Sequence, residues 1–321
     1  MELQESTNRL VELIRHSQSP YHTMKEAISQ LEKAGFERIS LAESAALEPG
    51  KAYYVSIYDR SLAAFRVPQS GFKGFRIITS HIDNPCFMIK PNPERKKSDC
   101  ITLNVERYGG PILNTWLDRP LTIAGRVCVA TEDPFNPQTI LYNSKKPVAV
   151  IPNLAIHMNR DANSGIKYNP QKDMIPLFGE ISAKNKFEKI IAKEANTDTD
   201  SIVSADLFLY NREKGTVWGA DNEFISVPRL DDVMCAYSCI NALIKSKETN
   251  KESVNVCAVF DNEEVGSTTK QGADSSFLTD VLSRISMCKG KDNEDFIRAC
   301  ASSFMLSADN AHAVHPNYKE K

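Results

Sequence analysis

The sequence predicts an α/β fold that is interrupted by an inserted, mainly β segment. Helical and strand-like patterns alternate from residue 1 to 92 and again from 227 to 321. Between residues 93 and 226, short β-like runs are separated by turns rich in proline and asparagine. A length of 321 residues favours two domains, since domains usually hold roughly 100–200 residues. We therefore expect a discontinuous α/β domain, 1–92 and 227–321, and an inserted β-rich domain, 93–226.

Two amphipathic helices open the first domain, and the second of them has apolar residues at helical spacing up to Leu31, before Gly35. Strand-like runs follow at 51–58, 62–67 and 74–80, and the last leads directly into His81. In the inserted segment, the β-like runs are 101–106, 121–130, 148–151 and 206–210, and a helical pattern covers 180–194.

The α/β pattern returns at residue 227, with a helical stripe over 233–244. A buried strand is expected at 253–260, helices at 276–288 and 292–301, and a last strand at 304–307.

Composition argues against several classes of function. The 39 basic and 41 acidic residues give a net charge of −2 without long blocks of like charge, which disfavours nucleic-acid binding. No apolar run approaches the roughly 18 residues of a membrane span, and the N-terminus lacks the apolar core of a secretory signal. The eight scattered cysteines form no C-x-x-C pair and indicate a reducing compartment. We expect a cytoplasmic protein without membrane partners.

Potential metal ligands stand where several of these elements begin or end. His81, the pair Glu263 and Glu264, and Asp309 each follow a strand-like run, and Asp231 stands at a helix start. In open α/β sheets, ligands bind beyond the carboxyl ends of the strands, so these side chains are expected to converge. Imidazole and carboxylate groups suit zinc.

Charge counting favours two metal ions. Asp231, Glu264 and Asp309 together with a bridging hydroxide carry about −4, which two Zn²⁺ ions balance. Asp83 is then placed to accept a hydrogen bond from the other ring nitrogen of His81. Because neighbouring residues in an extended chain point in opposite directions, Glu263 remains free to act as a general base.

Each of these features also has a simpler explanation. A Glu-Glu pair after a strand is usually a solvated loop, and an aspartate at a helix start, as at Asp231, is usually an N-cap. A His-x-Asp segment is usually a hydrogen-bonded surface pair. From the residue types alone, the substrate stays open.

The segments around these residues are more specific, and they resemble the aspartyl aminopeptidase family, metallopeptidase family 18, which includes vacuolar aminopeptidase I. Residues 79–86, Thr-Ser-His-Ile-Asp-Asn-Pro-Cys, resemble its His-x-Asp-Ser-Pro segment, and 228–232, Pro-Arg-Leu-Asp-Asp, its Arg-Leu-Asp-Asn. Residues 260–267, Phe-Asp-Asn-Glu-Glu-Val-Gly-Ser, match its Asp-x-Glu-Glu-[Ile/Val]-Gly-Ser. Residues 307–317, Ser-Ala-Asp-Asn-Ala-His-Ala-Val-His-Pro-Asn, nearly repeat its Ser-Ala-Asp-Met-Ala-His-Ala-Val-His-Pro-Asn. Residues 151–157, Ile-Pro-Asn-Leu-Ala-Ile-His, resemble a segment of its inserted domain.

This resemblance implies a role for each matching residue. His81 and Asp309 would hold one zinc, Asp231 would bridge both ions, and Glu264 would bind the second. Asp83 would orient His81.

The resemblance also implies the reacting groups. Glu263 would be the general base, and His157 of the inserted domain would reach the active site of a neighbouring subunit. His312 and His315 are expected to be structural. Asp232 stands where the family has Asn or Asp, and it is left out of the ligand set.

The resemblance further implies a zinc-exopeptidase-like catalytic domain and a β-rich dimerisation domain, in dimers that assemble into tetrahedral dodecamers. The expected reaction is removal of one N-terminal residue, acidic (Asp or Glu) or neutral, from a peptide. Two Zn²⁺ per subunit are expected, with Co²⁺ or Mn²⁺ as substitutes.

One departure leaves alternatives open. The family's last ligand of the second zinc is a histidine beyond the His-Pro-Asn segment, and none of the six histidines here has that position. Such a chain is expected to be C-terminally truncated, or to lack a complete second site. A related two-zinc deacylase and an inactive fragment that only assembles are the alternatives.

Overall fold

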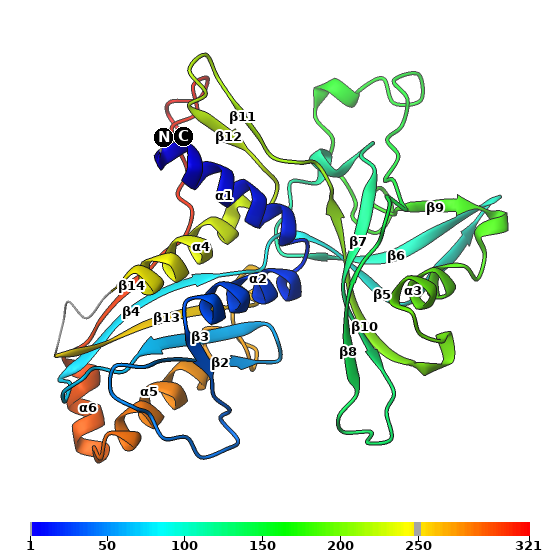
Figure 1. Cartoon of the computed structure of the whole chain (residues 1–321). Helices are drawn as coiled ribbons and strands as arrows, with labels where there is room; N and C mark the ends of the chain where they lie inside the picture. Colours follow the sequence, from blue (N-terminus) through cyan, green and yellow to red (C-terminus); the bar gives the residue numbers. More distant parts are fainter. Residues whose placement is uncertain (1, 247–251) are drawn as a thin grey trace. The chain divides into compact units, whose positions relative to one another are not determined.

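The computed structural model describes residues 2–246 and 252–321, and the chain forms two compact units (Figure 1). The first unit holds the residues up to Ile14, Thr23–Asp83 and Arg229–Lys321. The second unit holds Arg15–His22 and Asn84–Pro228. Each unit has its own sheet and its own apolar core.

The first unit is built on a six-stranded mixed sheet with the strand order β1-β2-β3-β13-β4-β14. Strand β4 lies between β13 and β14 and runs parallel to both, whereas β13 is antiparallel to β3. The strands are β1 (Phe36–Arg38), β2 (Ala52–Ile57), β3 (Ser61–Arg66), β4 (Gly74–His81), β13 (Ser253–Phe260) and β14 (Phe304–Ser307).

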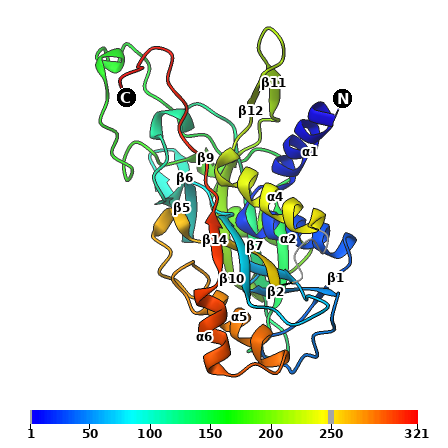
Figure 2. The same cartoon turned by 90° about the vertical axis from the view of Figure 1, so that its left-hand side faces the viewer.

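Helices cover both faces of this sheet (Figure 2). Apolar side chains of α2 and α4, such as Met24 and Ile240, share one core with one face, and those of α5 and α6, such as Val281 and Ala299, share a core with the other. Because both faces are covered, β13 reads as an almost continuous apolar run. The helices are α1 (Glu2–His16), α2 (Pro20–Lys33), α4 (Leu230–Lys245), α5 (Phe277–Cys288), α6 (Asn293–Ala301) and the short 3-10 helix η5 (Glu263–Val265).

The second unit is built on an antiparallel sheet with the strand order β8-β7-β10-β5-β6-β9. A separate hairpin and one α-helix complete its regular structure, together with four short 3-10 helices. The strands are β5 (Cys86–Lys97), β6 (Cys100–Tyr108), β7 (Leu121–Val129), β8 (Gln138–Asn143), β9 (Leu177–Glu180), β10 (Ile202–Asn211), β11 (Thr216–Trp218) and β12 (Phe224–Ser226). The helices are η1 (Leu113–Trp116), η2 (Ala162–Ser164), η3 (Ile181–Ala183), α3 (Phe187–Ala195) and η4 (Thr199–Ser201).

The expected α/β fold with a β-rich interruption is confirmed, and both strands expected after residue 250 have the predicted bounds. The helix expected at 180–194 is wrong in its first half, because β9 and a 3-10 turn precede Phe187 and Asn185 adopts a positive φ of 60°. The run 148–151 forms isolated bridges in place of a strand.

The first expected domain boundary, between residues 92 and 93, falls inside a strand. Strand β5 pairs with β6 on both sides of an irregularity between Ile89 and Glu94, and the prolines at 91 and 93 occupy this unpaired stretch. The second unit therefore already begins at Asn84. Among the helices that the structure describes, none combines the length and apolarity needed to cross a membrane.

Candidate metal centre

The site forms at the carboxyl ends of three adjacent parallel strands. His81, the last residue of β4, is level with Phe260 at the end of β13, and Thr79 is level with Ser307 at the end of β14. The segments that follow β13 and β14 therefore emerge beside His81, at the edge of the sheet where α/β proteins bind their ligands. Residues more than 200 positions apart in the sequence meet there because the strands that carry them are neighbours.

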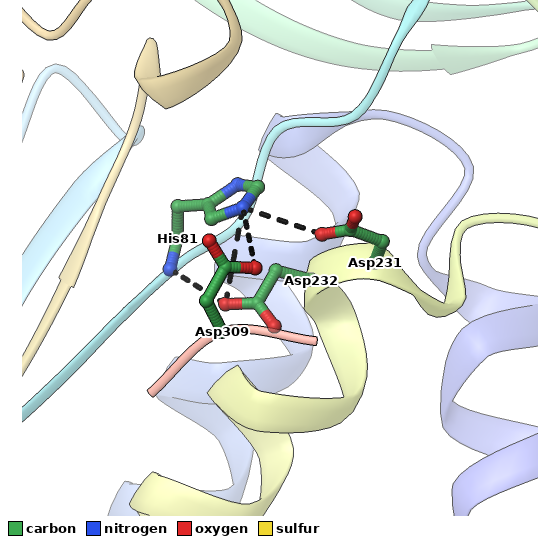
Figure 3. A group of neighbouring side chains, drawn as sticks. All are labelled: His81, Asp231, Asp232 and Asp309. Atoms are coloured by element: carbon green, nitrogen blue, oxygen red, sulfur yellow. Dashed lines mark hydrogen bonds and ion pairs between the residues drawn. The ribbon is translucent and has the colours of Figure 1, made fainter. Parts of the chain in front are cut away.

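The imidazole of His81 lies at the centre of a group of carboxylates (Figure 3). Its Nε2 is 3.4 Å from Asp231 Oδ1, 3.8 Å from Asp309 Oδ1 and 3.9 Å from Glu263 Oε2. The side chain of His81 is only 6% exposed, whereas those of Asp231 and Asp309 are each 58% exposed. Asp231 and Asp309 thus line an open side of the group, whereas the imidazole lies on its buried side.

Potential ligand atoms gather in two overlapping sets, and within each set all of them lie within 4.8 Å of one another. The first set contains His81, Asp231, Asp232 and Asp309, and the second contains His81, Glu263 and Glu264. The structure therefore brings together the five metal-ligand and base candidates expected from the sequence, and it adds Asp232.

Asp83 is fully buried and connects the imidazole to the segment after β13. Its Oδ1 is 3.3 Å from His81 Nδ1 and accepts a hydrogen bond from the backbone N–H of Glu263 at 3.2 Å. Its Oδ2 accepts one from the backbone N–H of Glu264, also at 3.2 Å. Both carboxylate oxygens are therefore engaged inside the protein.

The backbone around the two glutamates differs from the extended chain expected. Asn262 has a positive φ of 63°, and Glu263–Val265 forms the 3-10 turn η5. The argument from alternating side chains in an extended segment is therefore wrong. The backbone N–H groups of this turn bind Asp83, and both glutamate side chains come within reach of His81.

Asp232 is the residue of the group that the sequence interpretation left out. It is fully buried, its Oδ2 accepts the backbone N–H of His81 at 3.1 Å, and its Oδ1 accepts the side-chain amide of Asn310 at 3.0 Å. The peptide bond between Asp231 and Asp232 is cis. Residue type and position in the chain do not distinguish Asp232 from its neighbour, because both are acids at the start of one helix; only the family segment treats them differently.

The electrostatics of the group favour a cation. Burial lowers the pKa of His81, but the hydrogen bond to Asp83 and the charges of Asp83, Asp232 and Glu263 outweigh it, so that the pKa rises to about 9. Burial, followed by the charge of Asp83, raises the pKa of Glu264 to about 7. Carboxylates that lie this close together repel one another unless a positive charge lies between them.

The pKa of Asp231 is also raised, first by burial and then by the charge of Asp309. Among the residues that the structure describes, no lysine or arginine pairs with Asp231, Glu263, Glu264 or Asp309. One imidazole and several carboxylate oxygens are a donor set that zinc accepts. The residues present therefore fit a zinc centre.

The remaining histidines lie outside both sets. His157 is exposed in a turn of the second unit, and His312 and His315 are exposed after β14. The ring of His315 packs against Tyr318, with 5.0 Å between the ring centroids. Within residues 2–246 and 252–321, His81 is the only histidine that contributes to either set.

Comparison with known proteins agrees with this geometry. A family model described as aminopeptidase I zinc metalloprotease (M18) matches residues 13–321. The chain is 50% identical over 325 residues to a probable M18 family aminopeptidase 2 of Clostridium acetobutylicum, with 99% of this chain and 74% of the relative covered.

Solved structures show the same similarity. A chain in the cryo-EM structure of the Ape4 and Nbr1 complex aligns with a TM-score of 0.89 and 34% identity, over 97% of this chain and 64% of that one. The S. cerevisiae mApe1 dodecamer aligns with a TM-score of 0.84 and 26% identity, over 100% of this chain and 75% of that one. The chain therefore belongs to the aminopeptidase I zinc metalloprotease family, M18, a family of metalloaminopeptidases.

Proposed function

We propose that this chain contributes the centre of a two-zinc aminopeptidase that removes the N-terminal residue of peptides. The observation that carries the proposal is that His81, Glu263, Glu264 and Asp309, at the ends of three parallel strands, meet Asp231 at the start of α4. A cluster with one imidazole, several carboxylates that share it without a lysine or arginine partner, and an open side suits metal-assisted hydrolysis.

In this proposal, His81 and Asp309 would hold one zinc, Asp231 would contribute to both sites, and Glu264 would hold the second. The distances from His81 Nε2 to Asp231 and Asp309, 3.4 and 3.8 Å, support the first assignment. The potential ligand atoms of Glu264, His81 and Glu263 all lie within 4.8 Å of one another, which supports the assignment of Glu264 to the second zinc. By family resemblance, one further histidine completes the second zinc.

Zinc, when bound, would polarise the scissile carbonyl and lower the pKa of the attacking water. Asp83 holds the imidazole of His81 at Nδ1, which leaves Nε2 to face the ion. Glu263 would take a proton from the water at its carboxylate while the water oxygen bonds to the carbonyl carbon. It would then give that proton to the departing amine nitrogen as the C–N bond breaks.

We propose an acidic or neutral N-terminal residue for the substrate, on the basis of the family resemblance. We also propose that the chain acts as a homo-oligomer, supported by the dodecameric S. cerevisiae relative. The eight free cysteines support a reducing, cytoplasmic location.

His157 is proposed to act at the active site of a neighbouring subunit. The residues beside it are apolar and exposed: Leu154 is 57%, Ile156 is 48% and Met158 is 71% accessible. Exposed apolar residues gathered in one segment are typical of surfaces that a partner covers. A role for the second unit in dimerisation would place this segment against another copy.

Two glutamate substitutions test the assignments. Glu263→Gln should keep the wild-type zinc content and lower kcat by about 10²–10⁴, since it removes the general base. Glu264→Gln should lose about one zinc per chain. Glu294→Gln, on the exposed first turn of α6, is the matched control.

The zinc content is measured by mass spectrometry. Turnover is measured on the p-nitroanilides of Asp, Glu and Leu, each with and without an N-acetyl group. Wild-type turnover in Glu263→Gln would refute the base assignment. Hydrolysis of the N-acetylated substrates would support a deacylase. About one zinc without turnover, in a chain that still assembles, would support a fragment that only assembles.

A further inference from the structure

Two residues outside the proposed ligand set meet beside the metal centre. Asp232 stands at the last position of Arg-Leu-Asp-Asn, where the family has Asn or Asp, and Asn310 stands at the Met of Ser-Ala-Asp-Met. They are 78 residues apart in the sequence, yet Asn310 Nδ2 donates to Asp232 Oδ1 at 3.0 Å. The same amide nitrogen also donates to the backbone carbonyl of Leu230 at 3.1 Å.

The other oxygen of Asp232 extends this contact to the third element of the site. Asp232 Oδ2 accepts the backbone N–H of His81 at 3.1 Å, so one buried carboxylate connects the end of β4, the start of α4 and the segment after β14. Each of these three elements carries one residue of the first proposed zinc site. Both oxygens of Asp232 are already hydrogen-bonded inside the protein, whereas Asp231 and Asp309 are 58% exposed and can face an ion.

We propose that Asp232 and Asn310 form a polar clamp that positions Asp231, His81 and Asp309 before zinc binds. The inference rests on the proposed function, because it concerns the same metal centre. Asp231 and Asp309 are exposed carboxylates of like charge, and each raises the free energy of holding the other nearby. The clamp opposes this repulsion because it joins the residues that follow each of them in the chain.

The hydrogen-bond chemistry makes the two residues a matched pair. In Asn310→Met, the buried carboxylate of Asp232 loses its amide donor and keeps the Cys235 side chain and the backbone N–H of His81 as hydrogen-bond partners. In Asp232→Asn, one of the two oxygens is replaced by an NH₂ group. This NH₂ group faces either the NH₂ of Asn310 or the backbone N–H of His81, so in both orientations two donors oppose each other. Turning the amide of Asn310 would instead bring its oxygen against the carbonyl of Leu230.

The double substitution Asp232→Asn with Asn310→Met removes this conflict, because the thioether carries no donor. The clamp therefore predicts strong non-additivity. Each single substitution should weaken zinc binding about 10-fold or more, the usual effect of losing a partner of a metal ligand. The double variant should bind zinc within about 3-fold of the wild type.

The experiment measures the zinc dissociation constant by chelator competition and the melting temperature of the metal-free protein. Each single variant should lower the metal-free melting temperature by about 2–4 °C, and the double variant by less than their sum. The visible spectrum of the Co²⁺-loaded protein should shift in the single variants and recover in the double. Asn241→Met is the matched control, because that half-buried amide donates to Tyr237 O on α4, outside the metal centre.

Additive effects in zinc affinity and melting temperature would overturn the clamp, as would a wild-type dissociation constant in Asn310→Met. These outcomes are separate from a failure of the proposed function. If the wild type bound no zinc, the proposed function would be wrong. The melting temperatures of the metal-free variants would still decide whether Asp232 and Asn310 are coupled.

Discussion

The replacement Asp83→Asn would test how the buried part of the metal centre supports its ligands. Both oxygens of Asp83 accept a backbone N–H, one from Glu263 and one from Glu264. An asparagine retains one oxygen, so in either orientation of its amide an NH₂ group faces one of these donors. If the amide is turned toward Glu263, it also faces the Nδ1 of His81, which lies 3.3 Å from the present oxygen.

The expected magnitude follows from these contacts. A buried N–H that loses its acceptor costs about 1–3 kcal/mol of folding stability. Changes in the partner of a metal-ligating histidine lower metal affinity about 10- to 100-fold, which equals about 1.4–2.7 kcal/mol. Because Asp83 is fully buried, solvent is not expected to replace the lost interaction.

The assay compares zinc affinity by chelator competition and urea unfolding of the metal-free protein. Asp133→Asn is the matched control, since this exposed carboxylate also accepts a backbone N–H, that of Phe135, in the second unit. The control should keep the wild-type zinc affinity. If Asp83→Asn bound zinc within about twofold of the wild type and unfolded at the same urea concentration, Asp83 would not be positioning His81 and the glutamates.

Two further substitutions probe other parts of the chain. His157→Phe should lower turnover about a hundredfold, the scale of losing one transition-state hydrogen-bond donor, with zinc content and native mass unchanged; full activity would remove His157 from the site. Tyr54 donates to Glu32 at 2.7 Å, and burial together with this bond raises the pKa of Tyr54 to about 12. Its stabilising effect should therefore be present below pH about 10 and disappear as the pH rises toward 12. Urea unfolding of Tyr54→Phe should show a deficit of about 1 kcal/mol at neutral pH that shrinks over this interval, and a constant deficit would contradict the reasoning.

The elements of the first unit could be predicted because their patterns report burial directly. Strand β13 is covered on both faces and reads as an apolar run, and α4 presents one apolar stripe to the sheet. The second unit was harder to predict because its strands are defined by pairing with one another, and pairing produces a weaker sequence pattern than burial does. The expected boundary at residue 93 falls inside a single strand, β5, whose ladder is interrupted where the prolines at 91 and 93 stand.

The ligand candidates could be anticipated from their place after strands, since parallel neighbours in a sheet end at the same edge. The different roles of the individual carboxylates could not be anticipated in this way. Asp83 and Asp232 are fully buried and each accepts hydrogen bonds through both oxygens, whereas Asp231 and Asp309 are 58% exposed.

A carboxylate with both oxygens bound inside the protein holds its neighbours in place, and one that faces solvent can bind an ion. In the sequence, Asp231 and Asp232 are adjacent acids, and only the resemblance to the family segment treats them differently. In the structure, Asp232 is fully buried and accepts hydrogen bonds from the backbone N–H of His81 and the amide of Asn310, whereas Asp231 is 58% exposed. The different roles of identical side chains are therefore a property of the tertiary structure, which is why the hydrogen bonds of Asp232 could not be predicted from the sequence.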